Sequence, residues 1–393
     1  MQQRRRWTGW SRQRRRWTTW SSQRRRWLGL LASLTGAGVA QRLTAQDFPG
    51  QPHRYPAADL DYRLTFPRDF GAHPDFRTEW WYLTGWLDGE RGFQVTFFRV
   101  RTSHPDANPS RFAPTHLLFA HAALMLPDRR HALHGQRSAR VGSPQTGFSD
   151  QDTDIRIGDW ALSRDGYDRY RTTIRDSGFK LDLALAPPGQ PGQKIRQPWL
   201  QGERGYSRKG PGPDQASHYY SRPQLQVSGT VDGKAVSGVA WFDHEWSTTV
   251  LDPAAAGWDW TGINFDDGSA LVAFRIRRRD EVDAAGASPE PLWHYCALRH
   301  SDGSTEVIDT VRFDVLRQWQ SPRTMVTYPV VMKLVLPQRS LRLEPLFDDQ
   351  ELDNRGSTGT IYWEGAVRAF AEDGRQIGLG YLELTGYHAP LKF

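Results

Sequence analysis

The sequence predicts an all-β protein made of two tandem antiparallel β-barrels that arose by internal duplication. The stretch WYLTGWLDGERGFQVTFFRVR (81–101) resembles WDWTGINFDDGSALVAFRIRR (258–278), and both carry W-x-x-T-G, then an Asp-Gly pair, then F-R-x-R. A second pair, 227–243 and 363–383, shares D-G-[KR] and an aromatic, an apolar residue and an acid at its end. Repeats of this length indicate one architectural unit used twice.

The individual strands follow from the alternation of apolar and polar residues and from Asp-Gly hairpin turns. The 36 Gly and 25 Pro are spread along the chain, which favours short strands and turns, and no helical stripe is found after residue 45. Eight to ten strands in each half suit a barrel, whose mouth commonly forms a ligand pocket. We expect strands at 93–101, 117–126, 154–162, 179–186, 225–231, 270–277, 295–298, 307–315, 326–336 and 340–346, loops at 187–213 and 278–291, and barrels at 46–250 and 251–393.

Residues 1–45 predict a cleavable signal peptide. A decapeptide that begins QRRRW occurs three times, and its last copy leads into the apolar segment 28–40, which ends in small residues. A charged region, an apolar region and a small-residue end are typical of a signal peptide, and the apolar region is too short for a permanent membrane anchor. Arg24-Arg25-Arg26-Trp27-Leu28 resembles a twin-arginine signal, so we expect a periplasmic protein. A basic arm for nucleic acid or anionic lipid is the alternative.

Charge and cysteine content narrow the function further. The formal net charge of +7 is due to the leader, which holds 11 Arg and no acid; the rest has 40 Lys and Arg against 44 Asp and Glu. Such a balance does not favour a nucleic-acid partner. The single cysteine, Cys296, excludes an internal disulfide and lies in an apolar run, so we expect a buried small residue.

The stretch GVAWFDHEWSTT (238–249) contains the strongest candidate site. On a strand, Asp243 and Glu245 share one face and His244 and Trp246 the other. A carboxyl group among indole rings has a raised pKa and can act as a general acid. Alignment of Asp243 with Glu383 places Leu384-Thr385-Gly386 opposite the His-Glu-Trp of the first half. A requirement of the fold alone would appear in both halves, so we favour a functional role over a hydrogen-bonded strand end.

Other chemistries are less well supported. Thr248 stands where H-E-x-x-H needs its second His, so no zinc motif is present and we expect no metal, although ligands brought together from distant residues stay open. No G-x-S-x-G occurs, which argues against an α/β-hydrolase. Two further stretches place an acid next to indole side chains: EWWYLTGW (79–86) and Trp258-Asp259-Trp260. Aromatic faces stabilise a cation by about 0.5–2 kcal/mol, as protonation of an alkene would require; core filling is the alternative.

Three long motifs carry a family resemblance. HPDFRTEWWYLTGWL (73–87), QGERGYSRKGPGPDQASHYYSRPQL (201–225) and GVAWFDHEW (238–246) together resemble the lipocalin-like AttH and carotenoid 1,2-hydratase superfamily over about residues 55–390. The resemblance implies two lipocalin-like barrels and cofactor-independent hydration, in which an acid protonates an alkene and water captures the cation. His244 and Trp246 match the H-x-W pair implicated in catalysis, and Trp258-Asp259 is the best match to its aromatic–acid partner.

These observations lead to three hypotheses for an exported protein with an apolar pocket. It is a hydratase-like enzyme acting without a cofactor on a hydrophobic isoprenoid or lipid-like substrate, a binding protein for such a ligand, or a hydrolase. Contact with a membrane surface and the oligomeric state stay open. The expected catalytic residues are Asp243, His244, Glu245, Trp246 and Asp259. The side chains expected to contact substrate are Glu79, Trp80, Trp81, Tyr82, His121, Tyr219, Trp258 and Trp260.

The export hypothesis predicts that replacing both Arg24 and Arg25 with Lys blocks delivery to the periplasm. Twin-arginine signals depend on the arginine pair, whereas a basic arm would keep its charge and function after the change. Cell fractionation and immunoblotting measure the distribution. Unchanged periplasmic delivery of the double variant would contradict a twin-arginine signal.

Overall fold

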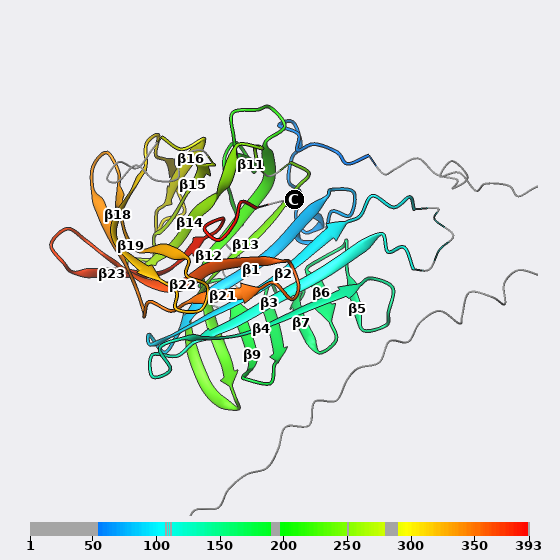
Figure 1. Ribbon diagram of the computed structural model, residues 1–393, viewed down its shortest axis with the longest axis horizontal. Coiled ribbons are helices and arrows are strands. Elements are labelled where there is room, and N and C mark those ends of the chain that lie inside the picture. The colour runs from blue at the N-terminus through cyan, green and yellow to red at the C-terminus, as the bar shows by residue number, and fades with distance from the viewer. Residues whose placement is uncertain are drawn as a thin grey trace, which may run out of the picture. The chain divides into compact units, whose positions relative to one another are not determined.

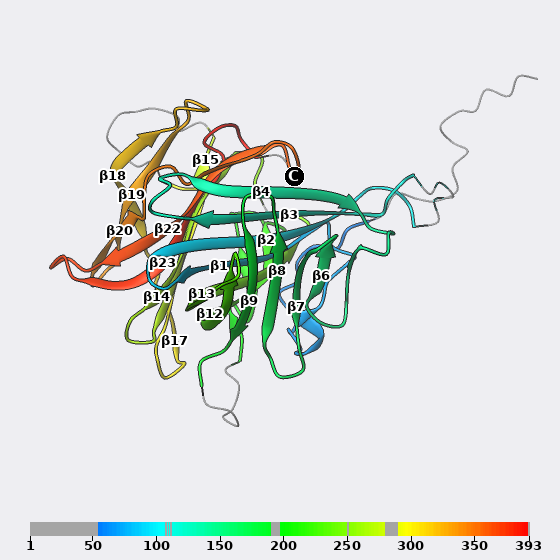
Figure 2. The same ribbon diagram turned by 90° about the horizontal axis from the view of Figure 1, so that it is seen from below.

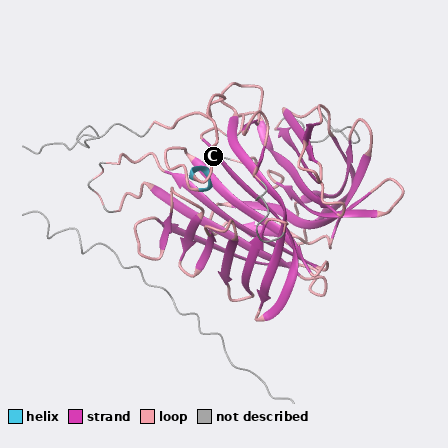
Figure 3. Cartoon of the chain, turned by 180° about the vertical axis from the view of Figure 1, so that it is seen from behind, coloured by secondary structure: helices cyan, strands magenta, loops and turns pink. Residues whose placement is uncertain are grey.

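The computed structural model describes residues 54–391 except 107, 109, 111, 190–196, 250 and 280–289; the predicted leader lies outside the described residues. In this part the chain is all-β apart from one 3-10 turn, η1 (Arg68–Phe70), as Figure 3 shows. Its strands form two antiparallel sheets of 13 and 10 strands. The predicted fold class is therefore confirmed. No helix among the described residues is long and apolar enough to cross a membrane.

The first sheet, sheet 1, contains the strands from Thr78 to Ser247. Its order is β4-β3-β2-β1-β13-β12-β9-β8-β7-β6-β5, with β10 and β11 paired to β12. Strands β12 and β13 form a long hairpin that joins the β1–β4 region to the β5–β9 region. The strands are β1 (Thr78–Leu87), β2 (Arg91–Arg101), β3 (His116–Met125), β4 (Ala132–Arg140), β5 (Thr146–Phe148), β6 (Asp154–Ile157), β7 (Trp160–Arg164), β8 (Tyr170–Arg175), β9 (Lys180–Ala186), β10 (Trp199–Leu200), β11 (Tyr206–Arg208), β12 (Ala216–Val231) and β13 (Lys234–Ser247).

The second sheet, sheet 2, repeats this plan with fewer strands. Its order is β17-β16-β15-β14-β23-β22-β20-β19-β18, with β21 paired to β22. The closing hairpin β22–β23 again lies beside the opening hairpin β14–β15. The strands are β14 (Ala255–Phe265), β15 (Ala270–Arg278), β16 (Trp293–Arg299), β17 (Thr305–Val307), β18 (Arg312–Gln320), β19 (Thr327–Val335), β20 (Ser340–Pro345), β21 (Glu351–Asn354), β22 (Thr360–Phe370) and β23 (Gln376–Leu384).

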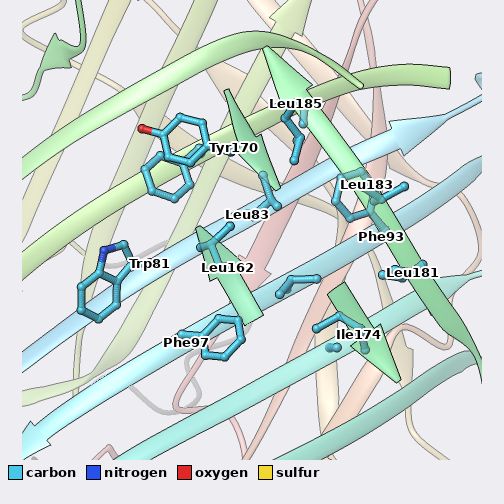
Figure 4. Close-up of a cluster of buried hydrophobic side chains, with 14 of the residues drawn as sticks. Trp81, Leu83, Phe93, Phe97, Leu162, Tyr170, Ile174, Leu181, Leu183 and Leu185 are labelled. Atoms are coloured by element: carbon cyan, nitrogen blue, oxygen red, sulfur yellow. The ribbon is translucent and has the colours of Figure 1, made fainter. Parts of the chain in front are cut away.

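Each sheet curls around its own hydrophobic core in a barrel-like form. In sheet 1, Trp81 and Phe97 of the opening hairpin face Leu162, Ile174 and side chains of β9, and Figure 4 shows them meeting across the interior. A second hydrophobic core is formed in the same way inside sheet 2. It includes Cys296, which is buried and forms no disulfide, as predicted. Both interiors are filled with side chains, because alternate residues on every strand point inward.

A third apolar cluster joins the two sheets, and we call this region the seam. Trp86 and Trp241 of sheet 1 pack there with Trp260, Phe274 and Tyr381 of sheet 2. The indole N–H of Trp86 donates to the carbonyl oxygen of Gly380 at 2.9 Å. Figures 1 and 2 both show β22 and β23 running beside β1 and β2. The opening hairpin of sheet 1 therefore packs on the closing hairpin of sheet 2, and β14 packs on β12 and β13.

Several element boundaries differ from the sequence prediction. The expected strand 154–162 is two strands, β6 and β7, separated by a turn in which Gly158 has a φ of 64°. The expected strand 307–315 likewise divides into β17 and the start of β18. The expected loop 187–213 contains β10 and β11, which pair with β12. These short strands have too few residues to show a period of two, so pairing with a long neighbour decides their conformation.

The structural register of the repeat also differs from the sequence alignment. Glu79 pairs with Arg99 in the first half, and Asp259 pairs with Arg275 in the second. Trp80 then stands opposite Glu245, just as Trp260 stands opposite Glu383. Glu383 is thus the counterpart of Glu245 and not of Asp243. With the halves anchored on these acid–Arg pairs, the second half does carry a glutamate at this place, which the alignment of letters did not show, because matching letters do not fix pairing register.

The close packing of β1 against β13 predicts that Gly238→Ala is destabilising. A Cβ at Gly238 would overlap the carbonyl oxygen of Trp86, and backbone cannot move aside as a side chain can. We expect a loss of about 1–3 kcal/mol in the free energy of unfolding, measured by urea denaturation. Gly147→Ala is the control, since a Cβ there meets nothing within 4 Å. Equal stability of the two variants would contradict the packing described.

Candidate functional site

A cavity of about 360 Å³ lies in the seam between the two sheets. Strands β1, β2, β3, β12 and β13 line one side, and β14, β15, β22 and β23 line the other. Mostly apolar cavities with a few convergent polar groups are typical ligand sites. The site was expected at a barrel mouth; it lies between the barrels because their interiors are filled. The aromatic side chains in its wall are Trp80, Tyr82, Phe98, Phe119, Tyr219, Trp258, Trp260, Phe274 and Tyr362.

Strand β13 supplies two carboxyl groups to this cavity. The strand is buried on both faces from Ala240 to Ser247. Because its side chains alternate, Asp243 and Glu245 line the cavity, while His244 and Trp246 point into sheet 1. The facing expected from the sequence is therefore observed, and both acids reach the cavity.

Asp243 is held by three hydrogen-bond donors. The hydroxyl of Tyr219 donates to Oδ2 at 2.7 Å, and the hydroxyl of Ser221 and the indole N–H of Trp241 donate to Oδ1 at 2.6 and 2.7 Å. Burial raises the pKa of Asp243 to about 7 in spite of these donors, and the nearby Glu245 carboxylate adds to the rise. Asp243 can therefore carry a proton near neutral pH, as a general acid must.

Glu245 has a cationic partner. The Lys209 ammonium lies 3.0 Å from Glu245 Oε1, and both side chains are buried. The same ammonium lies 4.1 Å from the ring centroid of Phe274 and 4.6 Å from that of Tyr219. Lys209 follows β11 in a segment that the sequence predicted as loop, so nothing in its spacing indicated this contact.

Sheet 2 adds a pair of glutamates that were not among the predicted site residues. Glu364 and Glu383 stand directly opposite each other on β22 and β23, and both line the cavity. Burial raises the pKa of Glu383 to about 7, against a hydrogen bond from Trp258. Burial and then the Glu383 charge raise the pKa of Glu364 well above its usual range. The available signal was a single acid in each of two otherwise uncharged, largely apolar stretches, IYWEGAV (361–367) and GLGYLEL (378–384).

His244 belongs to a buried network on the other face of β13. Its Nε2 lies 2.9 Å from Glu79 Oε1, and its Nδ1 lies 3.0 Å from the hydroxyl of Tyr220. Glu79 also contacts His73 Nδ1 at 2.8 Å and accepts from Arg99 Nε at 2.8 Å. Although burial acts in the opposite direction, Arg99 and these imidazoles hold the pKa of Glu79 well below its usual range.

Three residues of this network, His73, Glu79 and His244, are also the ones that could hold a metal ion. One ligand atom from each of His73, Glu79 and His244 lies within 4.8 Å of the others. The Arg99 guanidinium, however, already places a positive charge on Glu79. A cation at this position would meet that charge at close range, so we assign the group to an ion-pair network.

The remaining predicted catalytic residues do not line the cavity. Trp246 is buried in sheet 1 and stacks on His73 with ring centroids 3.5 Å apart. Asp259 points into sheet 2, where it accepts from Arg275 at 2.7 Å, Arg277 at 3.1 Å and Tyr387 at 2.9 Å. Both positions follow from strand alternation once the register is known.

The residues expected to contact substrate are mostly brought together. Trp81 is the exception, because it points into sheet 1 and stacks on His244 with centroids 4.8 Å apart. His121 adds an imidazole between two hydroxyl groups, 2.8 Å from that of Tyr362 and 3.0 Å from that of Ser357. The residues of this group that line the cavity are Glu79, Trp80, Tyr82, His121, Tyr219, Trp258 and Trp260.

Solved structures with the same architecture are known. A crystal structure of a candidate AttH protein from Nitrosomonas europaea is 45% identical, with a TM-score of 0.75 over 84% of this chain and 99% of that chain. Kievitone hydratase from Nectria haematococca is 14% identical, with a TM-score of 0.59 over 87% of this chain and 99% of its own, and shares the fold. A comparison with curated proteins found no match.

The family model described as AttH-like matches residues 57–387. This range includes both sheets and every residue of the cavity wall up to Thr385. The resemblance seen in the three sequence motifs is thus confirmed, and this chain belongs to the AttH-like family.

Proposed function

We propose that this protein is an exported hydratase-like enzyme that adds water to an alkene of a hydrophobic isoprenoid or lipid-like substrate bound in the seam cavity. The observation that carries the proposal is Asp243, a carboxyl group with a pKa of about 7 in an aromatic wall. The shared fold of kievitone hydratase is consistent with such chemistry in this architecture. Protein groups and water are sufficient for the reaction, so the proposal includes no cofactor.

The surroundings of Asp243 suit a residue that gains and loses a proton. The hydroxyls of Tyr219 and Ser221 can donate to the carboxylate or accept from the acid, so they serve both states, whereas the Trp241 indole only donates. The indole N–H of Trp260 donates to the Tyr219 hydroxyl oxygen at 3.2 Å. Asp243 can therefore keep hydrogen-bond partners in either protonation state.

The proposed reaction has two steps. The Asp243 carboxyl group protonates the alkene, and a tertiary cation forms between the indoles of Trp80, Trp258 and Trp260. Water then adds to the cation and returns its proton to a carboxylate, so that one water molecule is gained. Indole faces stabilise the cation by about 0.5–2 kcal/mol each, and the Glu364–Glu383 pair is a second place where a proton can be held.

His244 acts in this proposal through Glu79 and not on the substrate. Its Nε2 fixes one oxygen of Glu79 while Arg99 fixes the other. Glu79 reaches the cavity wall beside Trp80. The imidazole therefore holds a buried ionised carboxylate behind the wall that Trp80 forms, and the H-x-W pair supports the site from inside sheet 1.

The proposal predicts hydration of prenyl-type alkenes in water labelled with heavy oxygen. Mass spectrometry should detect one labelled water added per product molecule, and Asp243→Asn should lower the rate about 100-fold or more, as expected for loss of a general acid. The exposed Asp61→Asn is the matched control and should retain full activity. Ligands that bind without conversion would support the binding-protein hypothesis. An active Asp243→Asn variant would exclude Asp243 as the acid.

The raised pKa of Asp243 also predicts how stability depends on pH. The pKa in the unfolded chain is about 3.9, so the folded protein holds this proton more tightly. The resulting stabilisation is complete below about pH 4 and is lost as the pH rises to about 7. Urea unfolding should show the wild type losing about 1 kcal/mol per pH unit relative to Asp243→Asn between about pH 5 and 7. A difference that does not change with pH would mean that Asp243 is ionised throughout.

A further inference from the structure

One group in the seam cavity is not used by the proposed hydration. His121 lies on β3 of sheet 1, whereas Ser357 lies in the turn between β21 and β22 of sheet 2, and Tyr362 lies on β22. Ser357 Oγ is 3.0 Å from His121 Nε2, and the Tyr362 hydroxyl is 2.8 Å from His121 Nδ1. All three residues line the cavity. A serine, an imidazole and a group that orients the imidazole are thus aligned at a ligand site.

The hydrogen bonds allow Ser357 to be a proton donor to the imidazole. When Nδ1 carries the proton and donates to the Tyr362 oxygen, Nε2 is free to accept from Ser357. The Ser357 hydroxyl has a second acceptor, the carbonyl oxygen of Asn354 at 3.2 Å. His121 is almost fully buried, and its burial, with a smaller effect of His134, lowers its pKa to about 3. The ring is therefore neutral at neutral pH, as a general base must be.

We propose that Ser357 and His121 form a nucleophile–base pair that cleaves activated esters of hydrophobic acyl groups. Ser357 Oγ attacks the acyl carbon as His121 Nε2 takes its proton. The bond from the acyl carbon to the leaving oxygen breaks, and the proton passes to that oxygen. Water then attacks the acyl-serine and gives its proton to Nε2, and Ser357 regains a proton as the carboxylic acid leaves.

The wall around Ser357 fits this chemistry. Thr358 of this turn and Thr360 at the start of β22 also line the cavity, with their hydroxyl oxygens 2.7 Å apart. When Thr358 donates to Thr360, the Thr360 hydroxyl is a neutral donor available to the oxyanion that forms on the acyl group. Phe98 packs beside His121, with ring centroids 5.1 Å apart, and holds one side of the imidazole ring. The weak basicity of His121 restricts the reaction to good leaving groups.

This site was not predicted from the sequence because its parts are far apart. Ser357 and His121 are 236 residues apart in the chain, and no G-x-S-x-G surrounds Ser357. The proposal does not rest on the hydration proposal, since Asp243, Glu364 and Glu383 take no part in it. The hydrolase hypothesis thereby gains a specific nucleophile.

A fluorophosphonate probe tests the proposal directly. Attack by Ser357 forms a Ser–phosphorus bond and expels fluoride, and peptide mass spectrometry locates the adduct. We expect the wild type to be labelled at Ser357, Ser357→Ala to be unlabelled, and His121→Gln to react about 100-fold more slowly. Ser304→Ala is the control, because this exposed hydroxyl donates to Asp302 in its own turn and is not part of the cavity wall. Its labelling rate should equal that of the wild type.

Two further measurements separate chemistry from a structural contact across the seam. Tyr362→Phe removes the oxygen that holds Nδ1–H, so labelling at Ser357 should slow about tenfold; a purely structural role would leave the rate unchanged. Hydrolysis of a p-nitrophenyl ester should be lost in Ser357→Ala, which removes one partly exposed hydroxyl, and an unchanged urea unfolding curve would show that this variant is folded. A wild type that is not labelled at Ser357, or a His121→Gln variant labelled at the wild-type rate, would overturn the proposal.

Discussion

Strand β13 is buried on both of its faces, and this constraint determines where the ionisable groups of the site lie. Sheet 1 closes over one face and sheet 2 covers the other. A slip of one residue would exchange the two faces, placing Asp243 and Glu245 in the core beside Trp81 and moving His244 away from Glu79. The pairing of β13 with β1 on one side and β12 on the other prevents that slip.

The buried acids of the site are of two kinds, which differ in their partners and in the direction of their pKa shifts. Glu79 has a guanidinium partner, Arg99, and its pKa falls well below the usual range although burial opposes this. Asp243 accepts from Tyr219, Ser221 and Trp241 and Glu383 from Trp258, all neutral donors, so burial prevails and raises the pKa of each to about 7. The fold thus holds an ionised carboxylate behind the cavity wall and carboxyl groups that titrate near neutrality in the wall itself. Environments that separate the pKa values of neighbouring acids are how one site supports acid and base steps.

The features of the fold and site that depend on local sequence pattern could be predicted. Alternation and turn residues gave the all-β class, the repeat gave two sheets, and a period of two placed Asp243 and Glu245 on one face. Register and the relation between sheets depend on distant contacts, so Glu383 was matched to Asp243 and the cavity was expected at a barrel mouth. Lys209 and Ser357 lie in segments without periodicity, where the sequence carries no signal for orientation.

The seam position makes the site a product of the duplication. Glu245 and Glu383 occupy equivalent places, opposite Trp80 and Trp260, but their neighbours on the adjoining strands differ. Tyr219 stands beside Glu245, where Lys209 also reaches it, whereas Glu364 stands beside Glu383. One copy therefore holds its glutamate with a cation, and the other holds its glutamate with a second acid that keeps a proton. Divergence of two neighbours turned a symmetric pair into two chemically distinct walls, and neither half of the chain contains both.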